Sequence, residues 1–236
     1  MIGIIGAMEE EVALFKKEMQ ETSSLGEKKI AGKNAQGFTY YTGKIAGEDV
    51  VLLQCGIGKV NAAVGAALMI ELYQPSLVIN TGSAGGMKSG EQKIGDVVIG
   101  NALVQYDVDV TAFDYKPGQV PRLPQFLESG PEIVGRAKAA AESLGIRCSV
   151  GLIGSGDAFM HKDAEIAALR KTFPDIAACE MEGAAIAQAC YVLDTPFLVI
   201  RALSDIAGAT SAEDNNNFVG LAAKHTTEIV KKLIRK

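Results

Sequence analysis

The stretch 178–185, Ala-Cys-Glu-Met-Glu-Gly-Ala-Ala, joins a predicted buried strand to a predicted helix of small residues. Alternate side chains of an extended segment point the same way, so Glu180 and Glu182 should share one face and Met181 the other. Two carboxylates beside an apolar strand are costly to bury without partners. The pattern is open to two interpretations: a polar site, or a helix-start acid with a solvated neighbour.

Outward from this junction, apolar runs typical of strands alternate with segments typical of helices. The predicted strands are Met1–Gly6, Phe38–Thr42, Asp49–Cys55, Leu77–Asn80, Asp96–Gly100, Leu103–Val110, Ile146–Ile153, Ile176–Cys179 and Pro196–Leu203. The predicted helices are Ala7–Gln20, Gly56 to the residue before Pro75, Pro131–Leu144, Asp163–Thr172, Gly183–Cys190 and Asn215–Arg235. Near-continuous apolar strands indicate a sheet covered on both faces, and a hairpin at Gly43–Gly47 makes it mixed. We therefore expect residues 1–236 to form a single-domain three-layer α/β/α sandwich with a mixed central sheet.

Composition narrows the function classes. The chain of 236 residues is 48% hydrophobic and 22% charged, with a formal net charge of −5, as in ordinary soluble globular proteins. The acidic balance argues against a nucleic-acid partner, and no basic cluster or long apolar run predicts a membrane partner. The N-terminal segment lacks the cationic region of a signal peptide, so we expect a cytoplasmic protein. Four cysteines without metal-ligand spacing and two histidines predict reduced core thiols and no metal or other cofactor.

Five predicted strands end in glycine, serine or acidic residues. Ligands of open α/β sheets bind outside the carboxyl ends of strands, where small residues let a ligand approach the backbone. The sequence has neither a complete dinucleotide fingerprint nor a phosphate-binding GxxxxGK[ST] loop. These ends therefore predict a crevice for a small molecule; they are 6–9, 55–58, 81–83, 154–157 and 204–205.

Glu11 is a candidate acid at the start of the first predicted helix. At 100° per residue it falls within an apolar arc, whereas Glu9 and Glu10 fall outside that arc. An acid facing the protein in a first helical turn is a candidate for a functional role, although Glu18 falls within the same arc. The arc is formed by Val12, Leu14, Phe15 and Met19.

Asp205 follows the most apolar predicted strand, with Ser204 beside it. It is either a turn or helix-cap aspartate, or a general acid kept protonated by apolar walls. Together with Glu11 and Glu182 it forms a set of acids without a serine–histidine pair. Cleavage of a glycosidic bond by water uses such acids, one to activate the water and another to protonate the leaving group.

The chain resembles the 5′-methylthioadenosine/S-adenosylhomocysteine nucleosidases of the nucleoside phosphorylase-like superfamily over essentially its whole length. The resemblance rests on seven motifs in the family's order: IGIIGAMEEEV (2–12), GIGKVNAA (56–63), NTGSAGG (80–86), DVDVTAF (107–113), SGDAF (155–159), EMEGAAIA (180–187) and RALSD (201–205). It implies a nucleoside phosphorylase/hydrolase-like fold and a hydrolase that splits the N-ribosidic bond of its substrate without a cofactor. The implied setting is methionine salvage and recycling of S-adenosylmethionine by-products.

The resemblance also implies a role for individual residues. Glu11 is expected to activate the attacking water, and Asp205 to protonate or hydrogen-bond the imidazole ring of the adenine. Met181 and Glu182 are expected to hold the ribose hydroxyls, with Glu182 stabilising the oxocarbenium-like transition state. The other expected roles are positioning of the aspartate by Ser83, ordering of the site by Arg201, stacking on the purine by Phe159, backbone contacts to its edge by Met160, and lining of the 5′-thioalkyl pocket by Ile57 and Phe218.

The proline-rich segment Thr111–Pro131 is predicted to be a long loop. In the family such a loop completes the substrate pocket of a second subunit, which implies a homodimer with Phe113 and Pro121 reaching the partner's site. One departure concerns residues 211–217, Ser-Ala-Glu-Asp-Asn-Asn-Asn, where the family often has Ser-Phe-Asp/Glu. It affects the match of Phe218 and the closure of the 5′ pocket.

Three alternatives stay open at this point. A phosphate-dependent purine nucleoside phosphorylase would need a cationic cradle, yet Arg201 is the one arginine at a candidate strand end. A futalosine-type hydrolase would differ in pocket shape, and a non-catalytic nucleoside-binding protein would not need all three acids. The sequence leaves open the preference among methylthioadenosine, S-adenosylhomocysteine, 5′-deoxyadenosine and futalosine-like substrates.

Overall fold

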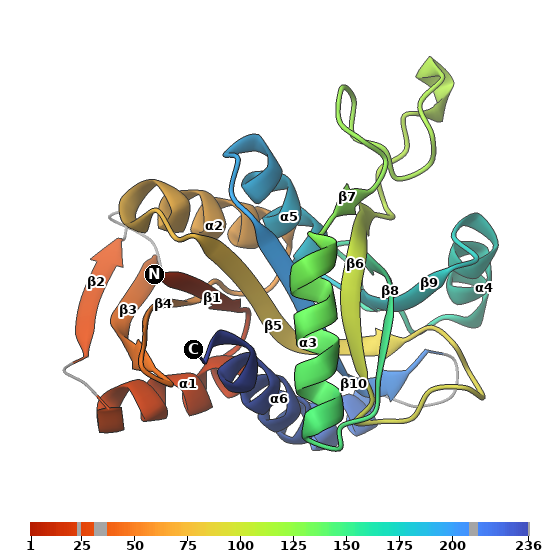
Figure 1. Ribbon diagram of the computed structural model, residues 1–236. Helices are drawn as coiled ribbons and strands as arrows, with labels where there is room; N and C mark the ends of the chain where they lie inside the picture. Colours follow the sequence, from red (N-terminus) through yellow and green to blue (C-terminus); the bar gives the residue numbers. More distant parts are fainter. Residues whose placement is uncertain (23–24, 31–36, 208–211, 236) are drawn as a thin grey trace.

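The computed structural model describes residues 1–22, 25–30, 37–207 and 212–235. It has a mixed α/β fold whose central mixed sheet lies between helices, which confirms the predicted fold class (Figure 1). The strands are β1 Ile2–Gly6, β2 Gly26–Ile30, β3 Phe38–Ile45, β4 Glu48–Gln54, β5 Leu77–Gly86, β6 Val97–Gln105, β7 Leu127–Glu128, β8 Cys148–Ser155, β9 Ile176–Glu180 and β10 Phe197–Ile206. The helices are α1 Glu9–Thr22, α2 Lys59–Tyr73, α3 Pro131–Ser143, α4 Asp163–Thr172, α5 Gly183–Val192 and α6 Ala212–Ile234, with a 3₁₀ turn, η1, at Thr111–Phe113.

The strand order in the described part of the chain is β10-β6-β8-β9-β5-β1-β4-β3-β2. Parallel pairs join β1 to β4 and β5, whereas β3 and β4 form the predicted antiparallel hairpin. Strand β10 pairs with both β5 and β6, and β9 joins β8 to the end of β5. The strands β5, β10, β6, β8 and β9 therefore close into a ring, which the sequence did not reveal.

Helices cover both faces of the sheet. Phe15 and Met19 of α1 pack in one core cluster with apolar residues of α3 and α6. Small residues of α2 and α5 pack in a second cluster on the other face, as the alanine-rich sequences of these helices allow. One member of the predicted apolar arc of α1 is misplaced, because Leu14 is exposed.

Three strand boundaries differ from the prediction in a way that matters for function. Strand β5 runs on through 81–86, and β10 runs on through 204–206, because the two strands pair with each other along this extension. The register shifts between Leu203 and Asp205, which marks a bulge. Ser83 and Asp205 are therefore strand residues and not loop residues. The two strands predicted for 96–100 and 103–110 are one strand, β6, which has an irregularity between Gly100 and Ala102 and ends at Gln105, so that 106–110 are not strand.

Candidate active site

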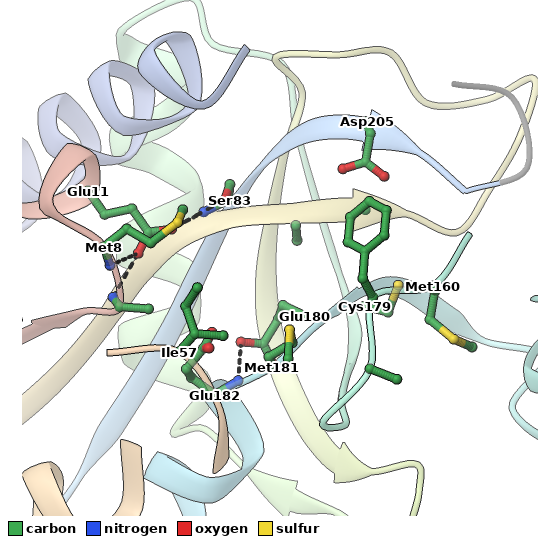
Figure 2. A pocket seen from close by; sticks show the side chains of 15 residues that line it. Met8, Glu11, Ile57, Ser83, Met160, Cys179, Glu180, Met181, Glu182 and Asp205 are labelled. Carbon is green, nitrogen blue, oxygen red and sulfur yellow. Dashed lines mark hydrogen bonds between the residues drawn. The ribbon is translucent and has the colours of Figure 1, made fainter. Parts of the chain in front are cut away.

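A cavity of about 320 Å³ lies over the carboxyl-terminal parts of β1, β5 and β9 and the start of α5. It brings together eight of the predicted site residues: Glu11, Ile57, Ser83, Phe159, Met160, Met181, Glu182 and Asp205. Glu11 with Ser83 lies on one side, Asp205 on another, and Glu182 with Met181 lies below them in the view of Figure 2. The prediction that strand ends converge on one crevice is confirmed for four of the five ends, which contribute Met8, Ile57, Ser83 and Asp205, whereas no residue of 154–157 lines the cavity.

Glu11 is buried, with 3% of its surface exposed, as its place in the apolar arc indicated. Its Oε2 accepts hydrogen bonds from the backbone N–H groups of Ala7 (2.7 Å) and Met8 (3.2 Å). Its Oε1 accepts from the N–H (2.9 Å) and the hydroxyl (3.2 Å) of Ser83. Four donors therefore hold one carboxylate in a fixed orientation at the cavity wall.

In this structure the Ser83 hydroxyl donates to Glu11, and the expected positioning of Asp205 by Ser83 stays a prediction. The Ser204 hydroxyl donates to Asp205 Oδ1 at 2.9 Å. Both serines are strand residues next to the cavity, and the extension of β5 and β10 decides which acid each one reaches. The sequence offered Ser204 as a neighbour of Asp205 but no signal for this contact.

Arg201 lies beneath the cavity and is fully buried. Its Nη2 donates to Asn80 Oδ1 at 2.6 Å, pairs closely with Glu180 and lies 3.6 Å from Glu182 Oε2. Nη1 has no hydrogen-bond partner among the described residues. A Cβ at Gly82 would lie 2.2 Å from Nη1 and 2.4 Å from Glu11 Oε1, so glycine leaves room for both groups. The guanidinium therefore lies below the cavity, near Glu11 and in contact with Glu180 and Glu182, and its ordering of the site stays a prediction.

Glu180, which sequence reasoning placed at the junction without assigning it a role, is part of this buried cluster. Its carboxylate accepts hydrogen bonds from the N–H groups of Glu182 (3.0 Å) and Gly183 (2.8 Å) and from the hydroxyl of Ser155. The interpretation of a helix-start acid with a solvated neighbour is wrong, because both glutamates are buried. The sequence signal for this cluster was the presence of two carboxylates beside an apolar strand, because buried carboxylates need a partner. Arg201 is that partner.

The pKa of the Glu182 carboxyl is raised from its ordinary value of 4.5 to about 7. Burial is the main cause, and the negative charge of Glu180 adds to it. Arg201 and the hydrogen bond from Gly58 N–H to Oε1, at 2.9 Å, act in the opposite direction. Glu182 is thus a carboxyl that titrates near neutral pH inside the cavity.

The end of the cavity around Asp205 has a more apolar wall. Cys179, which the sequence predicted only as a core thiol, lines it together with Phe159 and Met160. Burial and the charges of Asp205 and Glu180 raise the pKa of the Cys179 thiol to about 12, so the thiol is a neutral lining group. A Cβ at Gly85 would lie 3.0 Å from Asp205 Oδ2, which shows how closely β5 approaches the carboxylate.

A second group of charged residues, the rim, lies at the start of α2, two residues after the cavity-lining Ile57; its Lys59 and Asp157 line a separate groove. Lys59 Nζ donates to Asp107 Oδ1 at 2.6 Å and to Gln105 Oε1 at 3.1 Å, and its backbone N–H donates to Asp157 at 2.8 Å. These contacts join the start of α2 to the segments that follow β6 and β8. Gly58, with a φ of +99° that favours glycine, directs its N–H to Glu182.

Four predicted residues do not line this cavity in the single chain: Arg201 lies beneath it, and three others lie elsewhere. Phe113 is 75% exposed on the segment between β6 and β7, which projects from the rest of the molecule (Figure 1). Pro121 is exposed on the same segment. Phe218 is partly buried in α6 and is not among the cavity-lining residues, and the side chains of 211–217 before it lie outside what the structure describes.

The described residues contain no group of three or more histidine, cysteine, aspartate or glutamate side chains arranged to hold a metal ion. None of the helices in the described ranges is both long and apolar enough to cross a membrane.

Comparisons with known proteins agree with the geometry. The family model described as the Phosphorylase superfamily matches residues 1–235. The 5′-methylthioadenosine/S-adenosylhomocysteine nucleosidase of Geobacillus thermodenitrificans is 47% identical over 228 residues, which cover 96% of this chain and 93% of that protein. The corresponding protein of Hydrogenovibrio crunogenus is 45% identical over 234 residues, covering 99% of this chain and 97% of that protein.

Solved structures lead to the same family. That of the nucleosidase from Colwellia psychrerythraea, in complex with adenine, has a TM-score of 0.91 and 43% identity, covering 98% of this chain and 93% of that one. A futalosine hydrolase of Helicobacter pylori has a TM-score of 0.87 and 29% identity, covering 99% and 96%. From these matches over nearly its full length, the chain belongs to the 5′-methylthioadenosine/S-adenosylhomocysteine nucleosidase family of the phosphorylase superfamily.

Proposed function

We propose that this protein hydrolyses the N-ribosidic bond of 5′-methylthioadenosine and S-adenosylhomocysteine, releasing adenine and the 5′-substituted ribose. The observation that carries the proposal is the placement of Glu11, Glu182 and Asp205 around one cavity. The relatives named above are nucleosidases for these two nucleosides, and one related structure contains adenine. Hydrolysis of 5′-deoxyadenosine would need no different group in the site.

Glu11 is the proposed general base. Its fixed carboxylate can accept a proton from a water molecule that attacks the ribose carbon of the breaking bond. The adjacent Arg201 Nη1 is a buried donor without a partner among the described residues, directed at the same space beside Gly82.

Glu182 and Met181 are the proposed ribose-binding residues. Gly58 N–H occupies Oε1 of Glu182, so the carboxylate is anchored on one side and lines the cavity. Positive charge develops on the ribose ring as the bond to adenine breaks. An ionised Glu182 in this buried site stabilises that charge more than a solvated carboxylate would.

Asp205 is the proposed acid for the leaving adenine. Ser204 holds one of its oxygens, and the surrounding wall of Phe159, Met160 and Cys179 suits the flat, largely apolar purine. A proton or hydrogen bond given to the purine ring lets adenine leave as a neutral molecule. The roles of Phe159 in stacking and of Ile57 and Phe218 at the 5′ group belong to this proposal.

A phosphorylase is the nearest alternative within the superfamily. A phosphate nucleophile needs a cationic cradle, but neither lysine nor arginine is among the residues that line the described cavity. Glu11 and Glu182 would repel a phosphate dianion. Water is therefore the nucleophile that the charges favour.

The deciding experiment is adenine release from methylthioadenosine in phosphate-free buffer, repeated with added phosphate. Equal release in both, with free methylthioribose as product, is expected. Strict dependence on phosphate would reassign the reaction to phosphorolysis. Parallel assays with S-adenosylhomocysteine, 5′-deoxyadenosine and futalosine rank the substrates, and exclusive turnover of futalosine would place the chain with the futalosine hydrolases.

Substitution of the two catalytic acids tests the enzyme against a silent nucleoside-binding protein. Glu11→Gln and Asp205→Asn should each lower kcat by about 10²- to 10⁴-fold, the usual contribution of general acid–base catalysis. Both variants keep the shape of the side chain and should still bind adenine, as calorimetry would show. Full activity in either variant would remove that residue from its role.

We also propose that the active form is a homodimer in the cytoplasm. Val60 and Val64 of α2 and Val192 and Leu193 of α5 are exposed and line one groove, a surface that suits a partner. Phe113 is exposed on the projecting segment, which could reach a second subunit's cavity. Sedimentation should give twice the chain mass, and Phe113→Ala should raise KM; a monomer with normal KM would contradict the dimer.

A further inference from the structure

Arg201 lies closer to the carboxylate of Glu180 than to that of Glu182. Its Nη2 pairs closely with Glu180 but stays 3.6 Å from Glu182 Oε2, although both glutamates belong to the same short stretch of chain. The guanidinium is fully buried, so in this cluster its charge is not shared with solvent. Which carboxylate holds Arg201 therefore decides how much negative charge Glu182 presents to the cavity.

Glu180 is held in place by more than the ion pair. Ser155 on β8 donates its hydroxyl to Glu180 and accepts the N–H of Ala184 at 2.7 Å. The Glu180 carboxylate in turn accepts the N–H groups of Glu182 and Gly183 at the start of α5. These contacts satisfy the first N–H groups of the helix with a carboxylate, which is also the charge that a helix N-terminus favours.

We propose that Glu180 is a positioning residue for the reaction: it keeps Arg201 closer to itself than to Glu182 and fixes the first turn of α5, so that an ionised Glu182 is less closely paired and acts on the ribose. The inference rests on the proposed function and extends it to a residue that does not touch the reacting atoms. Glu180 lines the bottom of the cavity, but its carboxylate oxygens are already occupied by Ser155, Arg201 and backbone N–H groups.

The physical argument compares two arrangements of one cation and two carboxylates. With Glu180 in place, Arg201 neutralises Glu180, and Glu182 faces the cavity with a hydrogen bond from Gly58. Without the charge of Glu180, Arg201 would move to Glu182 and form the closer pair there. A neutralised Glu182 would stabilise the cationic ribose less in the transition state, so kcat should fall more than KM rises.

The same change should alter the titration of Glu182. The groups that face it are Glu180 on β9, Arg201 on β10, Glu11 on α1, the Cys55 thiol after β4 and the Gly58 N–H. Glu180 and Glu11 raise the pKa of Glu182, and Arg201 and Gly58 lower it. Removing the charge of Glu180 and bringing Arg201 closer both lower this pKa.

The test compares Glu180→Gln and Glu180→Asp with the parent enzyme on methylthioadenosine, measuring kcat, KM and the pH profile. Glu180→Gln should lower kcat by about 10- to 100-fold, as for loss of a buried charged contact. The acidic limb of the pH profile of kcat, where Glu182 titrates, should move to lower pH by roughly one unit in this variant. That shift is the effect of one nearby charge on a pKa. Glu180→Asp keeps the charge with a shorter reach, so its limb should stay near that of the parent while kcat falls less.

Glu142→Gln is the matched control, since Glu142 is an exposed residue of α3 with only a 3.8 Å ion pair to Lys138. It should leave kcat and the pH profile unchanged. An unchanged kcat and acidic limb in Glu180→Gln would overturn the inference. If Glu180→Gln lowered kcat but left its limb in place, Glu180 would be a structural cap only, which also overturns it.

A crystal structure of Glu180→Gln provides a readout that does not depend on turnover, and it is expected to show Arg201 moved onto Glu182. Arg201 still at its present distance from Glu182 would overturn the inference even if the parent released no adenine. Failure of the parent to release adenine would instead count against the proposed function. If Glu180→Gln did not fold, Glu180→Asp would give the same comparison, with Arg201 expected between the two acids.

Discussion

Two groups of charged residues approach Glu182: the floor, which lies below the cavity, and the rim, which lies at the start of α2. At the floor Arg201, fully buried, meets Glu180 and Glu182, and at the rim Lys59, 16% exposed, meets Asp107, 32% exposed. Similar contacts have different consequences, because charges in a protein interior interact far more strongly than charges near water. A change at the floor should therefore affect stability and chemistry together, whereas a change at the rim should affect mainly the position of the loops.

The rim nevertheless reaches the floor through the backbone. Lys59 and Asp157 hold the start of α2, and the preceding Gly58 donates its N–H to Glu182. Both groups thus act on the Glu182 carboxylate. The floor acts through the charges of Arg201 and Glu180, and the rim acts through the hydrogen bond from Gly58. The comparison can be tested by changing one group at a time.

The largest effect should follow from Arg201→Met. Loss of the buried cation leaves Glu180 and Glu182 without their partner, and removing one member of a buried pair costs about 3–5 kcal/mol of unfolding free energy. Urea unfolding at pH 8 measures this loss, which should shrink at pH 5 because a protonated Glu182 no longer needs the cation. Arg201→Lys should recover part of the unfolding free energy. If Arg201→Met lost less than about 1 kcal/mol, the buried charges of the floor would contribute no more to stability than the partly exposed charges of the rim.

A somewhat smaller effect concerns the pH dependence of stability. The pKa of Glu182 is about 7 in the folded protein and ordinarily 4.5, so the folded state binds more protons between these values. The free energy of unfolding should therefore fall as pH rises from about 4.5 to about 7, by roughly 3 kcal/mol from this residue.

Glu182→Gln isolates that contribution, since glutamine can still accept the Gly58 N–H but carries no charge. Unfolding free energies of the parent minus those of Glu182→Gln should decline through this pH window and level off above it. Parallel curves for the two proteins across the window would show that Glu182 has an ordinary pKa.

The smallest effect is expected at the rim. Lys59→Met should cost about 1 kcal/mol or less in stability, as for partly exposed ion pairs, and should raise KM several-fold by loosening Gly58. Lys44→Met is the matched control, because Lys44 forms a 2.6 Å ion pair with Asp49 on the exposed β3–β4 hairpin. Equal kinetic constants in the two variants would exclude a link from the rim to Glu182.

Much of the fold follows from local patterns. Apolar runs bounded by glycine predicted most strands, and the Glu11 position within an apolar arc predicted its burial. The extension of β5 and β10 could not be predicted, because 81–86 is a glycine-rich segment with weak strand propensity. It forms a strand since each partner supplies the other's backbone hydrogen bonds, and such a contact between distant segments leaves no local signal.

In the site, too, some features have a local sequence signal, and others depend on contacts between distant segments. Residues that line the cavity come from motifs at strand ends, so their positions could be predicted, whereas the pairing of Ser83 with Glu11 and of Ser204 with Asp205 required the register. Glu180 was in view from the first stretch of sequence considered. Its role stayed hidden because Arg201 is 21 residues away and belongs to another strand.

The ring closed by β5, β10, β6, β8 and β9 has a consequence for the opposite end of the sheet. There β2 is the last strand in the order, and within the described ranges it pairs only with β3, along one of its two edges. Its residues Glu27, Lys28 and Lys29 are all exposed and charged. Charged side chains on an outer strand discourage aggregation between edges, so this short hydrophilic strand protects the solubility of the whole sheet.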